Sequence, residues 1–330
     1  MGRLIYAISL IALFVAATLA TWPQVAHLHT VFPFAQLVSV RGAGIATAAV
    51  LIVVVLLLAI VIRPARGFLS GLVVVLVLYC VANTAVLATR GTGSDSLTPD
   101  TDNTLTVAAW NTLGDAVPAE KIAAFATANG VDVLSLPETT QTRAHLVAAQ
   151  ILAAGGPAMT VHSVSNLASS PIHSTSLLLA TSLGDYSVTH ALGDTTLLPS
   201  LVAVPDGDAT RPTFVAVHTT PPVSTHMGDW RDDLGWVERL CDQPNVILAG
   251  DFNATVDHFP ADLGCSDAAQ FTGAAALGTW STSVPSLLGA PIDHVLYSSS
   301  WRAVGVSITT DNDEAGSDHR PLTTRLTPAR

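Results

Sequence analysis

Three long apolar runs in the first 90 residues constrain this chain more than any other feature, because no charged residue interrupts them. They cover residues 4–20, 45–62 and 68–88. About 20 apolar residues cross the hydrocarbon layer of a bilayer. The second and third runs therefore predict transmembrane helices. The first run, with 17 residues, lies at the lower limit of length.

The charges beside these runs predict how the chain is oriented. Residues 1–90 contain no Asp or Glu, and Arg63 and Arg66 lie in the short turn between the second and third runs. Basic residues favour the cytoplasmic side, so the third helix leads outward and the rest of the chain follows it. The first run is either a transmembrane helix or a cleaved signal peptide with small residues near Ala20. Both readings predict a multi-pass membrane protein whose C-terminal part is extracytoplasmic.

The remainder of the chain differs sharply in charge. All 25 acidic residues follow residue 90, beside 14 − 5 = 9 basic residues, so residues 91–330 carry a formal charge of 9 − 25 = −16. Such a charge disfavours general binding to duplex DNA, whose affinity comes largely from Lys and Arg contacts to phosphates. Residues 91–103 are rich in Gly, Ser, Thr and Asp and are typical of a linker. We therefore divide the chain into a transmembrane region at 1–90, this linker, and a globular domain at 104–330.

Short apolar runs alternate with amphipathic segments through the globular domain. Strands are expected at 105–110, 131–136, 159–164, 176–181, 187–190, 197–204, 213–217, 246–249, 292–297, 304–309 and 322–326, and helices at 118–129, 141–153 and 226–241. Polar residues with catalytic potential stand where these strands end or in the adjoining loops. They are Asn111, Glu138, His218, Asp251, Asn253, Asp318 and His319. An Asx turn explains any one of them but not the whole set.

All of these residues lie in a series of six motifs that resembles the ordered motifs of the endonuclease/exonuclease/phosphatase superfamily. The motifs are Val107-Ala-Ala-Trp-Asn111, Leu134-Ser-Leu-Pro-Glu138, Val217-His-Thr-Thr-Pro221, Gly250-Asp-Phe-Asn253, Ile292-Asp-His-Val295 and Ser317-Asp-His-Arg-Pro321. The resemblance covers residues 104–328. It implies an α/β fold, a four-layer α/β/β/α sandwich that here follows a three-helix transmembrane region.

The resemblance also implies a metal site. Glu138 is expected to be the main ligand of Mg²⁺ or Mn²⁺, with Asn111 and Asp318 nearby. Oxygen ligands that leave several waters on the ion suit both metals.

The same resemblance implies the catalytic groups. Asp251 and Asn253 are expected to hold the nucleophilic water and the phosphate. His319 is expected to contact the phosphate or to act in acid/base chemistry, with Asp293 orienting its ring. His218 is expected to protonate the leaving oxygen. Which group acts as the base stays open.

The sequence departs from the family pattern in several places. Pro137 precedes Glu138 where Gln is frequent, and Leu113 stands where the abasic-site branch has Asp. The second departure argues against abasic-site repair. His173 and Ser174 are weak candidates for the phosphate-binding segment in the middle of the domain. We expect His294 to be a packing residue, whereas Arg320 contacts either the substrate phosphate or local acids.

Two cysteines flank the Asp251 motif. Cys241 and Cys265 either form a disulfide, as an oxidising compartment allows, or remain unpaired.

These observations lead to one principal functional hypothesis and two alternatives. The principal hypothesis is a membrane-anchored, extracytoplasmic, metal-dependent phosphoesterase acting on a small phosphoester, a phospholipid headgroup or nucleic acid. The alternatives are a nuclease for extracellular DNA or RNA, and a catalytically silent binding protein on the same fold. The bilayer and the substrate are the expected partners, and no dedicated protein partner is inferred.

The orientation can be tested directly. Because Arg63 and Arg66 predict a cytoplasmic turn, a reporter fused after Arg330 should be active only outside the cytoplasm. Reporter activity in the cytoplasm would overturn the predicted topology.

Overall fold

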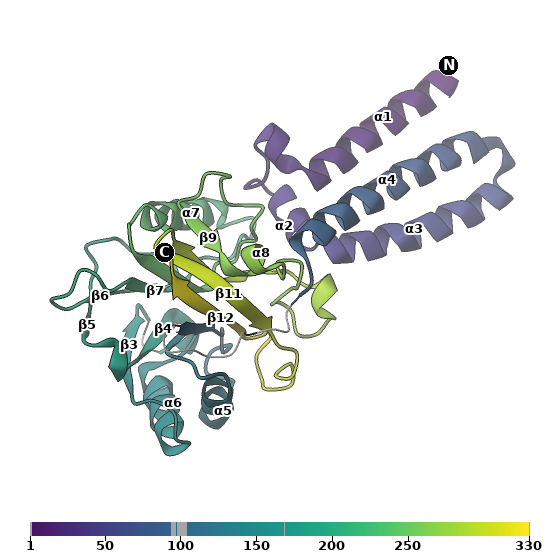
Figure 1. The fold of residues 1–330 in the computed structure, drawn as a ribbon. Helices are drawn as coiled ribbons and strands as arrows, with labels where there is room; N and C mark the ends of the chain where they lie inside the picture. The colour runs from purple at the N-terminus through teal and green to yellow at the C-terminus, as the bar shows by residue number, and fades with distance from the viewer. Residues whose placement is uncertain (1, 94–96, 98–103, 168, 330) are drawn as a thin grey trace.

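Three long helices project from an α/β lobe (Figure 1). The structure, a computed structural model, describes residues 2–93, 97, 104–167 and 169–329. The helices are α1 (Gly2–Thr21), α3 (Arg41–Val61) and α4 (Arg66–Arg90), and the short α2 (Phe34–Ser39) lies between α1 and α3. Three stretches, at 4–21, 41–61 and 63–90, are long and apolar enough to cross a membrane. They coincide with the three predicted apolar runs. Most of the predicted linker lies outside the described residues.

The lobe contains two six-stranded sheets. The first has the order β11-β12-β1-β2-β4-β3 and the second the order β5-β6-β7-β8-β10-β9. The strands of the first sheet are β1 (Leu105–Ala109), β2 (Val133–Pro137), β3 (Met159–Ser165), β4 (Ser174–Ala180), β11 (Trp301–Ile308) and β12 (Leu322–Pro328). Those of the second are β5 (Tyr186–Val188), β6 (Leu201–Pro205), β7 (Thr213–His218), β8 (Val246–Asp251), β9 (Cys265–Asp267) and β10 (Asp293–Ser298).

Side chains of both sheets alternate between two cores, as the period-2 geometry of a strand requires. Val107 and Ala109 of β1 join the core between the sheets, whereas Ala108 packs with the helices on the outer face. In the second sheet, Ala216 of β7 joins the inner core and Val217 joins the outer one. The inner core holds the two sheets face to face.

Helices cover both outer faces. α5 (Ala119–Asn129) and α6 (Gln141–Ala153) pack on the first sheet, and α7 (Met227–Cys241) packs on the second. The layers confirm the predicted α/β/β/α sandwich. A further short helix, α8 (Ala268–Thr272), follows β9. Neither β9, with three residues, nor α8, with five, was predicted, because so short a segment gives no periodic signal.

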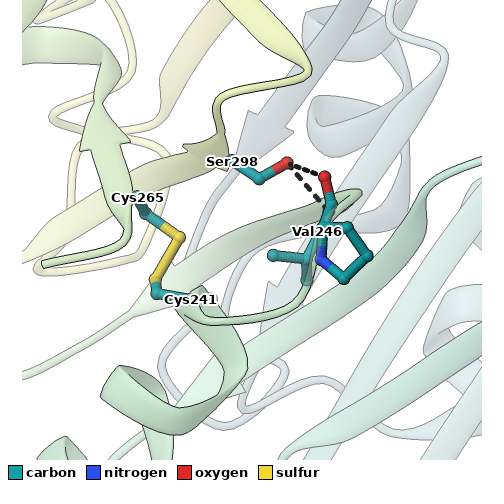
Figure 2. Close-up of a disulfide and its surroundings, with 5 residues drawn as sticks. Cys241, Val246, Cys265 and Ser298 are labelled. Atoms are coloured by element: carbon teal, nitrogen blue, oxygen red, sulfur yellow. Dashed lines mark hydrogen bonds between the residues drawn. A yellow bond between two sulfur atoms is a disulfide. The ribbon is translucent and has the colours of Figure 1, made fainter.

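The end of α7 is fixed to the second sheet by a disulfide. Cys241 and Cys265 are bonded across 24 residues of sequence (Figure 2). Nearby, the Ser298 hydroxyl accepts a hydrogen bond from the Val246 N–H at 3.1 Å and donates to the Pro244 carbonyl at 3.2 Å. The bond settles the pairing that the sequence left open. In the loop-closure model a bond across a loop of this length stabilises the fold by about 3 kcal/mol.

A buried ion pair network attaches the helices to the lobe. Asp257 accepts hydrogen bonds from Arg41 at 2.9 Å and from Arg90 at 2.6 Å, and Arg41 also contacts Asn83 at 2.7 Å. Burial alone would raise the pKa of Asp257, but the two guanidinium groups outweigh burial and lower it to about 2. The charge of Asp257 is therefore retained at neutral pH.

We expect this network to dominate the stability of the junction. Asp257→Asn leaves Arg41 buried without its counter-charge, so unfolding should become easier by roughly 3–5 kcal/mol. Because the pKa of Asp257 is lowered on folding, its contribution is full above about pH 4 and is lost as the pH falls toward 2. Thermal unfolding of the detergent-solubilised protein between pH 6 and pH 3 measures both effects. The exposed Asp262→Asn is the control, and equal melting temperatures for the two variants would contradict the assignment.

Candidate active site

The topology brings the predicted site residues to one edge of the sandwich. Strands β1 and β2 are parallel, as are β7 and β8, so their carboxyl ends meet at this edge. His218 lies beside Asp251 in the β7–β8 register, and Asp251 lies opposite Asp293 in the β8–β10 register. On their strands, these three residues belong to the same face of the second sheet as inner-core residues such as Ala249. The site is thus the polar end of the core between the sheets.

Gly250 permits the close approach of β8 to β7. Its φ is 149°, and a Cβ at this position would collide with the Val217 backbone carbonyl. Only glycine fits there, which explains the glycine in the Gly250–Asn253 motif.

His319 is held between two buried carboxylates. Its Nδ1 lies 2.8 Å from Asp293 Oδ2, and its Nε2 lies 3.7 Å from Asp251 Oδ2. The loop carrying His319 is fixed by two further hydrogen bonds. Ser317 Oγ accepts from the His319 N–H at 3.0 Å, and Trp110 Nε1 donates to the His319 carbonyl at 2.9 Å. The predicted Asp293–His319 hydrogen bond is therefore present.

Asn111 joins the two halves of the site. Its Nδ2 donates to Glu138 Oε1 at 3.1 Å and to Asp251 Oδ2 at 3.0 Å, while its Oδ1 accepts from the Leu113 N–H at 3.0 Å. The amide nitrogen therefore faces both carboxylates. Its role as a metal ligand stays a prediction.

Two site residues occupy the left-handed backbone region. Glu138 has a φ of 57° and Asn253 a φ of 45°. For residues other than glycine this conformation costs about 1–3 kcal/mol and persists only where the surroundings enforce it. For Asn253, the enforcing bonds are 2.9 Å contacts from its N–H to Asp251 Oδ1 and from its Nδ2 to the Thr219 carbonyl. These contacts fix the geometry of the loop after β8.

The two histidines of the site have opposite electrostatic environments. Burial, with a smaller contribution from the nearby charge of His319, lowers the pKa of His218 to about 3. Burial would also lower the pKa of His319, but Asp293 and Asp251 outweigh it and raise that pKa to about 10. At neutral pH His218 is therefore a neutral imidazole, and His319 carries a positive charge.

Burial also shifts the pKa values of two carboxylates in the site. Burial raises the pKa of Asp251 to about 7, against the opposing effect of His319. Burial also raises the pKa of Glu138. Glu138 Oε2, Asp293 Oδ1 and Asp318 Oδ1 are buried oxygen atoms without a hydrogen-bond partner. Unpartnered buried oxygens are unfavourable unless a cation or water meets them.

Two groups of residues are suited to a cation. One atom each of Asp251, Asp293 and His319 lie within 4.8 Å of one another. In that group, however, His319 Nδ1 already contacts Asp293, and its charged ring has no lone pair to offer. Glu138 and Asp318 instead present free oxygens, and Asp318 contributes to raising the pKa of Glu138. We favour the second group because it needs no change of protonation.

Other predicted residues lie at the edge of the site or outside it. His294 is buried, with Nδ1 at 2.7 Å from Asp267 and Nε2 at 2.8 Å from the Ala254 carbonyl, as expected for a packing residue. Arg320 is buried and pairs with Asp313 at 2.7 Å, which favours the local-acid alternative. His173 contacts Asn166 at 3.0 Å.

Sequence reasoning missed Trp280. Its Nε1 donates to Asp318 Oδ2 at 2.8 Å, and its backbone pairs with His319. It lies in an irregular loop where periodicity gives no signal.

Comparison with known proteins identifies the family. The sequence profile of the Endonuclease/Exonuclease/phosphatase family matches residues 108–319. The chain belongs to this family. No curated protein matches the chain significantly.

Solved structures of the family share the fold. D. rerio TDP2 complexed with single strand DNA product is 15% identical, with a TM-score of 0.52 over 68% of this chain and 100% of that one. An endonuclease/exonuclease/phosphatase from Beutenbergia cavernae is 19% identical, with a TM-score of 0.50 over 69% of this chain and 72% of that one. A family protein from Leptotrichia buccalis is 14% identical, with a TM-score of 0.51 over 67% and 99%. At such identities the likeness shows the fold alone.

The His319–Asp293 contact yields a kinetic prediction. His319→Ala should lower kcat by about 100-fold or more, because it removes the only cation among the three contacting groups. Asp293→Asn should lower kcat less, because it keeps the shape and loses only the charge. The two losses should be strongly non-additive, since the pair acts as one unit.

Kinetics of the two single variants and the double variant measure the coupling, with thermal unfolding as a check on folding. Fully additive losses, or normal turnover in His319→Ala, would remove His319 from the mechanism.

Proposed function

We propose that this chain is a membrane-anchored, divalent-metal-dependent hydrolase of phosphoester bonds whose lobe faces away from the cytoplasm. The observation that carries the proposal is the charged His319 ring, held by Asp293 and facing Asp251, beside the unpartnered oxygens of Glu138 and Asp318. A cation and an imidazolium around one small space suit a phosphate group. Family membership supports hydrolysis of phosphoester bonds.

Glu138 and Asp318 are the proposed metal ligands. Their unpartnered buried oxygens fit a hard cation, for which Mg²⁺ and Mn²⁺ are the candidates. When bound, the ion would neutralise charge on the phosphate and on the leaving oxygen. The Asn111 amide donates hydrogen bonds to Glu138 Oε1 and to Asp251 Oδ2, and so fixes the positions of both carboxylates.

The other residues act on the water and the phosphate. Asp251, fixed by the Asn253 N–H, orients a water molecule toward phosphorus. The water oxygen forms a new P–O bond and its proton passes to a carboxylate. The P–O bond to the leaving oxygen breaks, and that oxygen takes up a proton from the solvent to give the alcohol. The His319 cation stabilises the charge on the phosphate oxygens. His218, which has an unpartnered Nδ1 and an Nε2 at 3.8 Å from Glu138 Oε1, hydrogen-bonds the leaving oxygen as a neutral ring.

Two observations support the location. The three apolar helices are suited to crossing a membrane. The Cys241–Cys265 bond is typical of proteins outside the reducing cytoplasm.

A nuclease is the second candidate function. D. rerio TDP2, which shares the fold, is complexed with a single strand DNA product. The charge of −16 on residues 91–330 argues against long duplex DNA but is compatible with short single strands.

The proposed role of Glu138 as a metal ligand can be tested directly. Glu138→Gln keeps the shape of the side chain and removes its charge, so hydrolysis of bis(4-nitrophenyl) phosphate should fall by about 100-fold or more. Binding of Mn²⁺, followed separately by calorimetry, should weaken as well. The exposed Glu120→Gln on α5 is the matched control and should change neither quantity. Normal activity and normal Mn²⁺ binding in Glu138→Gln would refute the assignment.

A further inference from the structure

One long segment of the lobe carries no charge. Residues 268–292, between Asp267 and Asp293, include no Asp, Glu, Lys or Arg over 25 positions. Residues 91–330 as a whole have 25 + 9 = 34 charged residues in 240, about one in every seven. Its buried residues, such as those at 274–277, need no charge, but its exposed residues are uncharged as well.

This segment, which we call the uncharged rim, lies against the lobe-proximal ends of two membrane helices. The N–H groups of Ala275 and Ala276 donate to the carbonyls of Arg90 and Gly91 at 3.2 and 3.1 Å. Farther along, the Leu287 carbonyl packs against Gly42 in the first turn of α3, so closely that a Cβ would collide with it. Figure 1 shows this part of the chain beneath the lower end of α3. The uncharged rim therefore follows the expected surface of the bilayer.

The same segment forms one wall of the active site. Trp280 contacts Asp318 and pairs with His319, and the Thr279 hydroxyl accepts a hydrogen bond from the Asp293 N–H at 3.1 Å. The buried guanidinium of Arg320 contacts carbonyl groups along the rim at 2.8–3.4 Å, those of Gly278, Ser281, Thr282 and Val284. The rim is thus fixed to the residue that follows His319.

Apolar side chains of the rim remain exposed. Phe271 is 54% exposed, Leu287 47% and Trp280 40%. Leu287 belongs to the apolar stretch Val284-Pro-Ser-Leu-Leu288. Exposed aromatic and aliphatic side chains are suited to the headgroup region of a membrane, where the Arg302 guanidinium, 5.7 Å over the Phe271 ring, can lie as well.

We propose that the uncharged rim sits on the bilayer surface and that the substrate is a phosphodiester lipid of that leaflet. The proposal rests on the proposed function and names its substrate class. A lipid phosphate lies at the level of the rim, next to Trp280 and Asp318, without leaving its membrane. Nucleic acid would instead have to approach the part of the chain at residues 91–330, whose charge of −16 repels an anionic polymer. Hydrolysis follows the same balance, in which water adds to phosphorus and one P–O ester bond of the lipid breaks, releasing an alcohol and a phosphomonoester.

The experiment compares lipid and soluble substrates with the full chain reconstituted into bilayers. The substrates are phosphatidylglycerol and phosphatidylcholine in the bilayer, free glycerophosphoglycerol, and soluble bis(4-nitrophenyl) phosphate. Leu287→Glu places a charge on the rim without touching the carboxylates or His319. Leu146→Glu, at a 50% exposed position on α6, is the matched control. We expect Leu287→Glu to lower lipid hydrolysis at least about 10-fold, with hydrolysis of the soluble diester unchanged, and Leu146→Glu to change neither.

The other outcomes would contradict the rim assignment, the substrate class or the proposed function. Equal loss of both activities in Leu287→Glu, or loss of neither, would overturn the rim assignment. Turnover of free glycerophosphoglycerol or of single-stranded oligonucleotides, but not of the bilayer lipids, would overturn the substrate class and leave the hydrolase intact. If the wild type hydrolyses neither the bilayer lipids nor any of the soluble substrates, the proposed function itself fails.

Discussion

Desolvation of charge at the edge of the sandwich constrains the whole site. Asp251, Asp293 and His319 are each at most 5% exposed, and an isolated ion at such depth is very unfavourable. Two carboxylates face one imidazolium, which compensates only part of that penalty, since burial still raises the pKa of Asp251 to about 7. Glu138 adds another carboxylate, buried enough for its pKa to rise. Clustered, buried carboxylates with unpartnered oxygens are the physical reason for expecting a cation here.

The attachment of the three long apolar helices is not independent of this site. Asp257, which receives Arg41 and Arg90, lies only four residues after Asn253 in the same loop. His258 extends the junction, since its Nδ1 accepts from the Thr255 N–H at 2.7 Å and its Nε2 contacts the Ala35 carbonyl at 3.1 Å. The loop that bears Asn253 near one end is therefore bound to the helices at the other. A displacement of the helices would disturb the loop as well.

Much of this arrangement was predictable from sequence, for reasons that differ by element. α6 has the predicted bounds, 141–153, because Thr140 caps its first turn by accepting from the Arg143 N–H. The site residues were predictable because strand ends carry them to one edge. The Trp280 loop was not, since its position depends on contacts from Arg320, some 40 residues away. The Cys241–Cys265 bond could only be left open, because sequence spacing does not give the distance between two cysteines.

His218 and His319 differ in the carboxylates that surround them, and this difference determines what each ring can do chemically. Both rings are buried at the same edge, yet two carboxylates face His319, whereas His218 has one carboxylate oxygen at 3.8 Å and an unpartnered Nδ1. Burial alone would keep both rings neutral, so the difference is due to the pairing of strands β8 and β10, which sets Asp251 opposite Asp293. In the proposed function, one ring is a fixed cation for the phosphate, and the other a neutral hydrogen-bonding group. Opposite electrostatic environments thus suit two identical side chains to different chemical roles.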